Sequence, residues 1–484
     1  MISRPPFYYR VAIKSLAPIY RHIVKRRSGK NSNYADEVAD RFGMRYTGKL
    51  DVNETPLETS SSALNDLSKT HASKASIIWC HAVSLGETNT IAPVLNLLMA
   101  QGYRIWLTNT TQTGYARAQR LYANQINEGK LFHSYVPIDT PPIIRKFLNY
   151  VNPCAALFVE TELWANTLHL LAVKDIPAIL VNARLSEKSY KNYKKIAKTS
   201  QSMMHNLSLI IAQDELSAKR FRCLGAKPSQ IRVAGSLKWT INAKLNHDDI
   251  THNPSAKSSF DMHRPIWVAA STHSGEESIA LMVQKQLIEQ AQTANALLIL
   301  VPRHPERFDE VAQLIEAFGF SYARRSDVVL PKQHCQVYLA DSMGELMQWY
   351  KTADLAFVGG SLVNVGGHNP VEAYVSGTPV VMGQFTQSCQ GVVDDLVAAD
   401  AMVQLTNAYT HKKGKSLDKP ILNQASTALF KPVFYWLTHK NVATQAGEAG
   451  RQLMHDNQVI LSQQVGMINE VIEAKNQALF EYLG

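Results

Sequence analysis

From residue 76 onward, short apolar runs alternate with stretches of helical periodicity, and this alternation constrains the fold more than any other feature. The runs are rich in β-branched and aromatic residues, as strands are. They lie at 77–82, 103–108, 155–159, 178–181 and 209–212 and, after a polar interruption, at 265–270, 296–301, 337–340, 355–358 and 379–382. Strands separated by helices form parallel sheets that are covered on both faces. The sequence therefore predicts an α/β chain with two doubly wound domains and a ligand cleft between them, at the carboxyl ends of the strands.

The rest of the 484-residue chain divides into flanking and connecting segments. A Ser- and Thr-rich stretch without periodicity predicts a loop, the polar interruption predicts a linker, and the last residues have helical periodicity. The predicted organisation is a basic N-terminal segment 1–50, a loop 51–75, a first domain 76–241, a linker 242–263, a second domain 264–440 and a helical extension 441–484.

The net charge of +10 is concentrated at the N-terminus. Residues 1–30 contain eight Lys and Arg and no Asp or Glu, so the remainder of the chain is nearly neutral. This distribution excludes a nucleic-acid binder with a basic face across a whole domain. The five cysteines are scattered and odd in number, so neither a disulfide framework nor a zinc ribbon is expected.

The N-terminal segment combines its charge with an apolar stripe at helical spacing: Tyr9, Ile13, Leu16, Tyr20 and Ile23. No stretch reaches the roughly 18 apolar residues of a membrane-spanning helix. A basic amphipathic helix with aromatic residues is typical of a membrane surface instead. We therefore expect residues 1–30 to contact a membrane, although Pro18 would kink such a helix. The alternative is a solvated basic terminus that packs on the protein.

Carboxylates follow two of the predicted strands of the first domain. In WCHAVSLGE (79–87), Ser84, Gly86 and Glu87 form a turn that opens the next helix. Glu87 is either a general base that points into the cleft or a carboxylate that complements the helix dipole. In VETELW (159–164), Glu160 and Glu162 would project to one face of an extended backbone. They are either functional carboxylates or a helix cap and an ion-pair partner.

Basic residues are expected beside the cleft, at the edge of the linker and at the end of a strand of the second domain. GSLK (235–238) places Lys238 after a glycine turn, and VPRH (301–304) ends an apolar strand with Arg303 and His304. Positive groups at a strand end suit a phosphate, although a surface lysine and a capping arginine are also ordinary. His273, His304 and His368 lack the spacing of metal ligands, so no metal site is expected.

A glycine-rich segment, FVGGSLVNVGGHNPVE (357–372), allows the backbone to approach a ligand closely. Asn369, Pro370 and Glu372 fit the Ncap, N1 and N3 positions of a helix. Glu372 therefore either closes a capping box or binds ribose hydroxyls while the helix start faces a phosphate. The run DSMGE (341–345) follows another strand in a similar way.

Together these segments resemble the 3-deoxy-D-manno-octulosonic acid (Kdo) transferases of lipopolysaccharide synthesis. The resemblance extends over roughly residues 76–405, in the order of the family. The matching stretches are HAVSLGE (81–87), TNTTQTG (108–114), FVETELWANT (158–167), LVNARLS (180–186), AGSLKW (234–239), STHSGEE (271–277), LVPRHPERF (300–308), DSMGELM (341–347) and VGGSLVNVGGHNPVEA (358–373).

The resemblance implies a GT-B glycosyltransferase with two Rossmann-like domains, the first for the acceptor and the second for the donor, and a crossover helix at the C-terminus. It implies CMP-Kdo as donor, a lipid A precursor as acceptor, and the cytoplasmic face of the inner membrane as location. Glu87 becomes the general base of an inverting transfer, and Glu162 and Lys238 become the transition-state stabilisers. The implied CMP site consists of Arg303, His304, Met343, Gly344, Glu345, Asn369, Pro370, Val371 and Glu372.

No cofactor is expected, because lysine and arginine can neutralise the single phosphate of CMP without a metal ion. The alternative enzyme is another two-domain glycosyltransferase or sugar-nucleotide epimerase with a uridine donor. A peripheral membrane scaffold that has kept the fold is the non-enzymatic alternative.

Overall fold

A computed structural model describes residues 2–28, 36–47, 76–240, 264–327, 334–406 and 418–483. The predicted loop 51–75 and linker 242–263 lie outside the described residues. The chain forms two compact units, residues 1–237 with 459–484, and residues 238–458. The N-terminal segment therefore belongs to the first unit, and the predicted extension 441–484 is divided between the two units.

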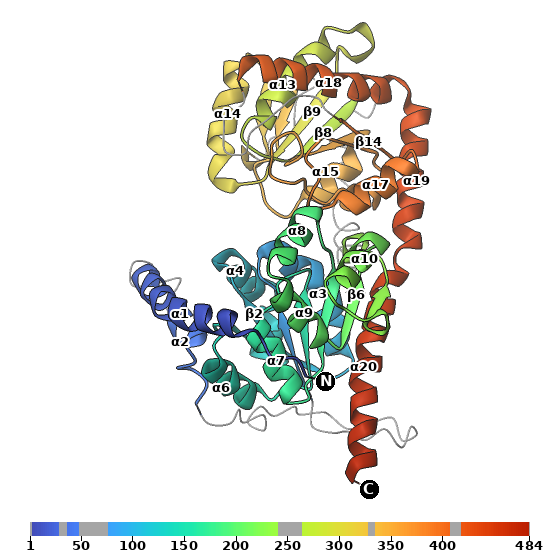
Figure 1. The fold of residues 1–484 in the computed structure, drawn as a ribbon. Coiled ribbons are helices and arrows are strands. Elements are labelled where there is room, and N and C mark those ends of the chain that lie inside the picture. Colours follow the sequence, from blue (N-terminus) through green and yellow to red (C-terminus); the bar gives the residue numbers. More distant parts are fainter. Residues whose placement is uncertain are drawn as a thin grey trace, which may run out of the picture. The chain divides into compact units, whose positions relative to one another are not determined.

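The first unit is built around a parallel seven-stranded sheet (Figure 1). Its strands are β1 (Ile77–His81), β2 (Arg104–Asn109), β3 (Leu131–Tyr135), β4 (Ala155–Val159), β5 (Ala178–Ala183), β6 (Leu209–Ala212) and β7 (Ile231–Val233), in the order β3-β2-β1-β4-β5-β6-β7. Its helices are α1 (Phe7–Ser28), α2 (Glu37–Arg41), α3 (Leu85–Ala100), α4 (Gln112–Leu121), α5 (Ala123–Asn127), α6 (Pro141–Val151), α7 (Ala165–Val173), α8 (Glu187–Lys195), α9 (Ala197–His205), α10 (Glu215–Cys223) and α20 (Val459–Leu483).

The second unit repeats this plan. Its parallel strands are β8 (Ile266–Thr272), β9 (Leu297–Pro302), β10 (Tyr322–Arg324), β11 (Val337–Leu339), β12 (Leu355–Val358), β13 (Val380–Met382) and β14 (Met402–Gln404), in the order β10-β11-β9-β8-β12-β13-β14. Its helices are α13 (Glu276–Ile288), α14 (Phe308–Ala317), α15 (Leu346–Thr352), α16 (Val371–Tyr374), α17 (Gln390–Ala398), α18 (Lys419–Thr438) and α19 (Lys440–Asp456). The prediction of two doubly wound domains is confirmed.

The central strands have continuous apolar sequences because helices cover both of their faces. Every residue of β1, β4 and β5 is buried, as is every residue of β9 and β12. The core of the first unit includes Trp79, Phe147 and Phe158, whose rings pack edge to face. In each sheet the strand order reverses beside the first strand, at β1/β4 and at β8/β12, which is where α/β sheets bind ligands.

Helix α1 rests on the first unit through part of the apolar stripe that is expected to face a membrane. The Tyr9 hydroxyl donates a hydrogen bond to the buried Asp139 carboxylate at 2.7 Å, and Tyr20 packs against Phe42. The predicted stripe is therefore divided between the protein and solvent. The large apolar side chains that α1 exposes are Phe7, Tyr8, Val11, Leu16, Ile19 and Ile23. None of the described helices has the length and hydropathy needed to cross a bilayer.

Candidate active site

The predicted carboxylates of the first unit follow the two strands at its switch point. Glu87 lies in the first turn of α3, after β1, and Glu162 lies between β4 and α7. These strands pair in parallel, with His81 opposite Phe158. The two loops therefore leave the same edge of the sheet side by side, which is the arrangement that a ligand site at a switch point requires.

The Glu87 carboxylate turns back over the start of α3. Its Oε2 accepts a hydrogen bond from the Val83 N–H at 2.6 Å, while the Ser84 hydroxyl caps the helix by accepting from the Glu87 N–H at 3.5 Å. Gly86 and Glu87 lie in the first turn of α3, so the predicted turn that opens the helix is the first turn of the helix itself. An N–H bond and a helix N-terminus both favour the charged carboxylate. The hydrogen bond from Val83 thus fixes the position of the Glu87 carboxylate at the start of α3.

Glu160 and Glu162 do not share a face in the way that an extended backbone would place them. Strand β4 ends at Val159, and Glu160 has a left-handed backbone with φ of 61°. The helix-cap alternative fails as well, because no side chain caps α7. Within the described part of the chain, the Glu162 carboxylate forms no ion pair, and burial raises its pKa. A half-buried carboxylate without a cation is costly in a purely structural role.

Lys238 belongs to the second unit and lies in a short 3₁₀ helix, Leu237–Trp239, after the turn at Gly235 (φ 84°). The Lys238 ammonium donates to the Ser388 carbonyl, and the Lys238 carbonyl accepts from the Asn369 amide at 2.9 Å. Two predicted site residues, Lys238 and Asn369, are therefore in direct contact.

Asn369 also fixes the start of α16, because its Oδ1 accepts from the Val371 N–H at 3.3 Å. The helix begins one residue later than predicted, with Pro370 in the cap position. The capping-box alternative for Glu372 is wrong, since its carboxylate makes no hydrogen bond to the described residues. Burial raises the pKa of Glu372, and the positive charge of Arg303 opposes this rise. Arg303 and Glu372 thus belong to one neighbourhood, as predicted for a nucleotide site.

The residues of the DSMGE run differ in their exposure and in their hydrogen bonds. Met343 is exposed, and Gly344 has a φ of 90° with open space where a side chain would lie. The Glu345 carboxylate accepts hydrogen bonds from Arg325, one of them at 2.9 Å, and from the Ser342 hydroxyl. Burial alone would raise the pKa of Glu345, but these bonds outweigh it and lower the pKa. Glu345 is therefore already engaged in holding its loop.

Comparisons with known proteins place this geometry in a family. A family model described as 3-deoxy-D-manno-octulosonic-acid transferase (kdotransferase) matches residues 54–241. The 3-deoxy-D-manno-octulosonic acid transferase of Haemophilus influenzae is 36% identical over 82% of this chain and 87% of its own length. The enzyme of the same name from Bordetella pertussis is 35% identical over 69% of this chain and 78% of its own.

This chain belongs to the Kdo transferase family. Solved structures with low sequence identity share its fold. A glycosyltransferase from Rickettsia africae, 11% identical, has a TM-score of 0.54 and covers 83% of this chain and 99% of its own. MurG of Acinetobacter baumannii, 12% identical, has a TM-score of 0.51 and covers 82% and 99%. The GT-B fold and the assignment as a glycosyltransferase are confirmed.

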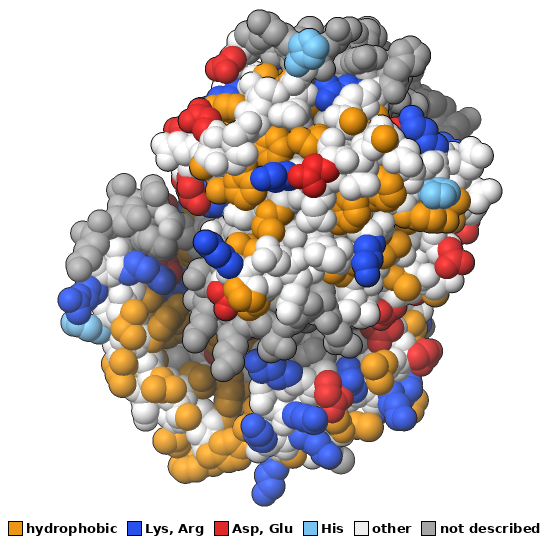
Figure 2. Space-filling view, turned by 90° about the horizontal axis from the view of Figure 1, so that it is seen from above, with side chains coloured by type: hydrophobic (Ala, Val, Ile, Leu, Met, Phe, Trp, Pro, Cys, Tyr) orange, Lys and Arg blue, Asp and Glu red, His pale blue; other side chains and the backbone are white. Residues whose placement is uncertain are grey.

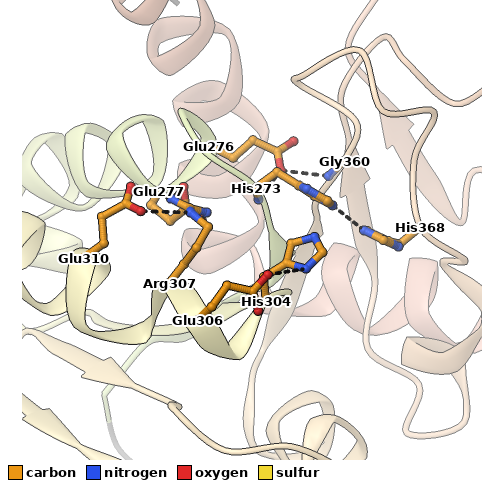
Figure 3. Close-up of polar contacts among 9 residues, drawn as sticks. All are labelled: His273, Glu276, Glu277, His304, Glu306, Arg307, Glu310, Gly360 and His368. Atoms are coloured by element: carbon orange, nitrogen blue, oxygen red, sulfur yellow. Dashed lines mark hydrogen bonds and ion pairs between the residues drawn. The ribbon is translucent and has the colours of Figure 1, made fainter. Parts of the chain in front are cut away.

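One organising residue of this Kdo transferase family member was missed as a site residue. Glu276, at the start of α13, is fully buried, and its two carboxylate oxygens accept four backbone N–H bonds, of which Figure 3 shows the one from Gly360. The donors are His273, Gly360, Ser361 and Leu362, at 2.8–3.0 Å. A Cβ on Gly359 would lie 2.5 Å from the Ser271 carbonyl oxygen, so glycine is required there. Glu276 thus fastens the glycine-rich loop to the end of β8.

The same two loops are joined by a histidine pair. The Nε2 atoms of His273 and His368 are 2.8 Å apart, and the ring of His304 lies 5.2 Å from that of His273 (Figure 3). Desolvation lowers the pKa of His273 to about 4 and that of His368 to about 3, and nearby positive groups add to this. Both rings are therefore neutral at pH 7. No group of His, Cys, Asp or Glu in the described ranges is arranged to hold a metal ion.

Proposed function

We propose that this chain transfers Kdo from CMP-Kdo to a lipid A precursor in lipopolysaccharide core biosynthesis and releases CMP. The observation that carries the proposal is its membership of the family, at 36% identity over 82% of the chain to a Kdo transferase. The carboxylates and cations present in the motifs that resemble the family support an active enzyme over a scaffold that has only kept the fold.

The proposed reaction is a single inverting displacement. The acceptor hydroxyl oxygen attacks the anomeric carbon of Kdo, and the bond from that carbon to the CMP phosphate oxygen breaks and leaves its electron pair with CMP. Glu87 takes the hydroxyl proton, a role that its hydrogen bond from Val83 supports by fixing the position of the carboxylate. Glu162 stabilises the oxocarbenium-like carbon, because a half-buried carboxylate interacts strongly with developing positive charge.

The proposed donor site lies at the switch point of the second sheet. Arg303 and Lys238 neutralise the phosphate that leaves with CMP, so the proposed transfer needs no metal ion. His304, Met343, Gly344 and the segment 369–372 complete the proposed nucleotide site. Glu345 supports it through its loop, because Arg325 and Ser342 occupy its carboxylate.

We further propose that α1 lies on the cytoplasmic face of the inner membrane. The left part of Figure 2, where α1 lies in Figure 1, shows hydrophobic side chains gathered together with Lys and Arg side chains at one end. Leu16, Ile19 and Ile23 are more than half exposed along this helix. An exposed apolar stripe flanked by basic residues favours an interface with anionic lipid, where each Lys or Arg contributes about 1 kcal/mol.

Mass spectrometry of a lipid A precursor incubated with the protein and CMP-Kdo, with and without EDTA, tests the proposal. We expect the acceptor mass to increase by whole Kdo units, with CMP released equally in both samples. Loss of the product with EDTA would overturn metal independence alone. CMP release without a change in acceptor mass would overturn the acceptor. Binding of UDP in preference to CMP, without any CMP release, would favour the uridine-donor alternative.

A further inference from the structure

A cavity of about 380 Å³ lies in the first unit, and none of its lining residues belongs to the proposed catalytic or nucleotide site. It is lined by α1, α2 and the turn between β2 and α4, through Tyr20, Arg27, Arg41, Thr110, Thr111, Gln112 and Thr113. These lining residues include two arginines and four side chains with hydroxyl groups, and no acidic residue. The composition of the wall is that of an anion site.

Arg41 is a buried charge that is held rigidly at this wall. Its side chain is 3% exposed, its Nε donates to Glu37 at 2.7 Å, and its Nη2 donates to the Thr110 carbonyl at 2.5 Å. The rings of Tyr20 and Tyr135 lie 5.9 and 5.1 Å from its guanidinium carbon. A guanidinium fixed in this way loses little side-chain entropy when an anion binds to it.

Arg27 provides a second guanidinium from α1. It forms an ion pair with the same carboxylate, Glu37, and its side chain is 44% exposed, so it can adjust to an incoming group. The fully buried Glu37 fixes both arginines relative to each other. Two planar guanidinium groups in one wall suit the oxygens of a phosphate.

Another part of the wall is the N-terminus of α4, a helix of ten residues. Thr111 caps it by accepting from the Gly114 N–H at 3.1 Å, and the first helical residues, Gln112 and Thr113, line the cavity. The first N–H groups of a helix have no acceptor inside it and carry the positive end of the dipole. Thus both parts of the wall favour negative charge.

The cavity lies next to the proposed base. The Val83 carbonyl accepts hydrogen bonds from the N–H groups of Thr110 and Thr111 at 3.1 and 3.0 Å, and the Val83 N–H holds Glu87 at 2.6 Å. Gly114 permits this close packing, because a Cβ there would lie 3.0 Å from the backbone of Ser84. One residue therefore separates the cavity wall from the carboxylate that would deprotonate the acceptor.

We propose that this cavity binds a phosphate group of the acceptor and so places the acceptor hydroxyl at Glu87. The identity of the acceptor rests on the proposed function, whereas the anion site rests on the cavity. The two guanidinium groups and the start of α4 contact the phosphate oxygens. The cavity is a positioning and specificity site, and no covalent step takes place in it.

The test measures the affinity of the full-length protein, in detergent and without CMP-Kdo, for a lipid A precursor before and after phosphatase treatment. We expect the wild type to bind the phosphorylated form at least about tenfold more tightly, as charge-assisted contacts imply. Arg27→Gln should remove most of this preference. Thr113→Glu should abolish it, because the new carboxylate repels phosphate while an acidic residue in the first turn suits the helix. Arg120→Gln and Gln119→Glu are matched controls at exposed positions of α4 outside the cavity.

An unchanged preference in both Arg27→Gln and Thr113→Glu would overturn the proposal. The proposal would also be overturned if these two variants lost binding to phosphatidylglycerol vesicles but kept their affinity for the acceptor. The phosphate bound in the cavity would then belong to a membrane lipid. Adding CMP-Kdo to the same samples separates the two proposals. A phosphate preference that depends on the cavity, without Kdo transfer, would support the anion site and overturn the proposed function. Kdo transfer without such a preference would support the proposed function and overturn the anion site.

Discussion

Glu87 shows why residue type and position alone leave two roles open. Its carboxylate both braces the β1–α3 turn through Val83 and lies at the switch point where the proposed reaction requires a base. The two roles differ in what they require of the side chain. Bracing requires an acceptor for one N–H bond, which an amide oxygen also provides, whereas proton transfer requires a carboxylate.

We therefore expect Glu87→Gln to fold as the wild type does and to lose at least about 100-fold in turnover, the range for loss of a general base. Affinity for CMP should not change, because the proposed nucleotide site is in the other unit. Rates of CMP release and calorimetric titration with CMP check this. Glu215→Gln, in the first turn of α10, is the matched control for loss of a carboxylate at a helix start. A Glu87→Gln enzyme that retains near wild-type turnover would assign Glu87 to bracing alone.

At the scale of elements, the contacts between β8–α13 and the glycine-rich loop depend on neutral histidines. The bond between His273 and His368 needs one Nε2–H donor and one unprotonated Nε2, so protonation of both rings breaks it. Glu276 joins the same loops through backbone N–H groups. The loop that carries the proposed nucleotide site is therefore held by one carboxylate and one pH-sensitive pair.

The contribution of the histidine pair to the stability of the second unit should decrease as the pH falls below 6.5. This contribution is measured as the difference between the wild type and His273→Gln, because the pKa of Glu276, which burial raises to about 7, has the opposite effect on stability. In the unfolded chain the two histidines bind protons with a pKa near 6.5. In the folded chain their pKa values, about 4 for His273 and about 3 for His368, keep both rings unprotonated at this pH. The stabilisation by the pair is thus present above pH 6.5 and is lost as the pH falls toward 4. Between pH 6.5 and 5.5 the pair should lower the free energy of unfolding by about 2 kcal/mol. Urea unfolding at several pH values measures this. His273→Gln should flatten the profile, and His455→Gln, at an exposed position of α19, should leave it unchanged.

Helix α1 is the element whose function depends most on which face is exposed. The exposed Leu16 should contribute to membrane contact. We expect Leu16→Glu to reduce binding to anionic vesicles by about tenfold, because an apolar side chain at the membrane surface is replaced by one with the same charge as the lipid. Vesicle flotation measures the bound fraction. Leu216 is a close match, since it is 55% exposed against 56% for Leu16 and lies on α10. Equal losses in Leu16→Glu and Leu216→Glu would contradict a specific role of α1.

For the whole molecule, the sheets show where sequence information fails. All four strands absent from the predicted set are edge strands, namely β3, β7, β10 and β14. Three of them have only three residues, and their side chains are largely half-buried or exposed. An edge strand has one neighbour and less cover, so its sequence carries little of the apolar continuity that marks a central strand.

The predicted C-terminal extension is divided between the two units, and the sequence pattern does not indicate this division. In α19, Gly447 and Gly450 let the helix approach the second unit so closely that a Cβ would lie 1.8 Å from the Gly377 carbonyl oxygen and 2.1 Å from the Tyr374 ring. Helix α20 instead rests on the first unit, where Gln464 donates to the Gly235 carbonyl at 3.0 Å. Helical periodicity reports a buried face but not the partner that buries it.

The sequence by itself determined the two α/β domains, the central strands, the loops that carry the candidate site, and the family. These follow from short-range patterns, because a strand buried on both faces has consecutive apolar residues and a motif consists of residues that are neighbours in the chain. Only the tertiary structure decided the left-handed turn at Glu160, the exposed face of α1, the anchoring of the glycine-rich loop by Glu276, and the cavity beside Glu87. Each of these joins residues that are far apart in the chain or depends on a backbone angle, and no local pattern of residue types records such information.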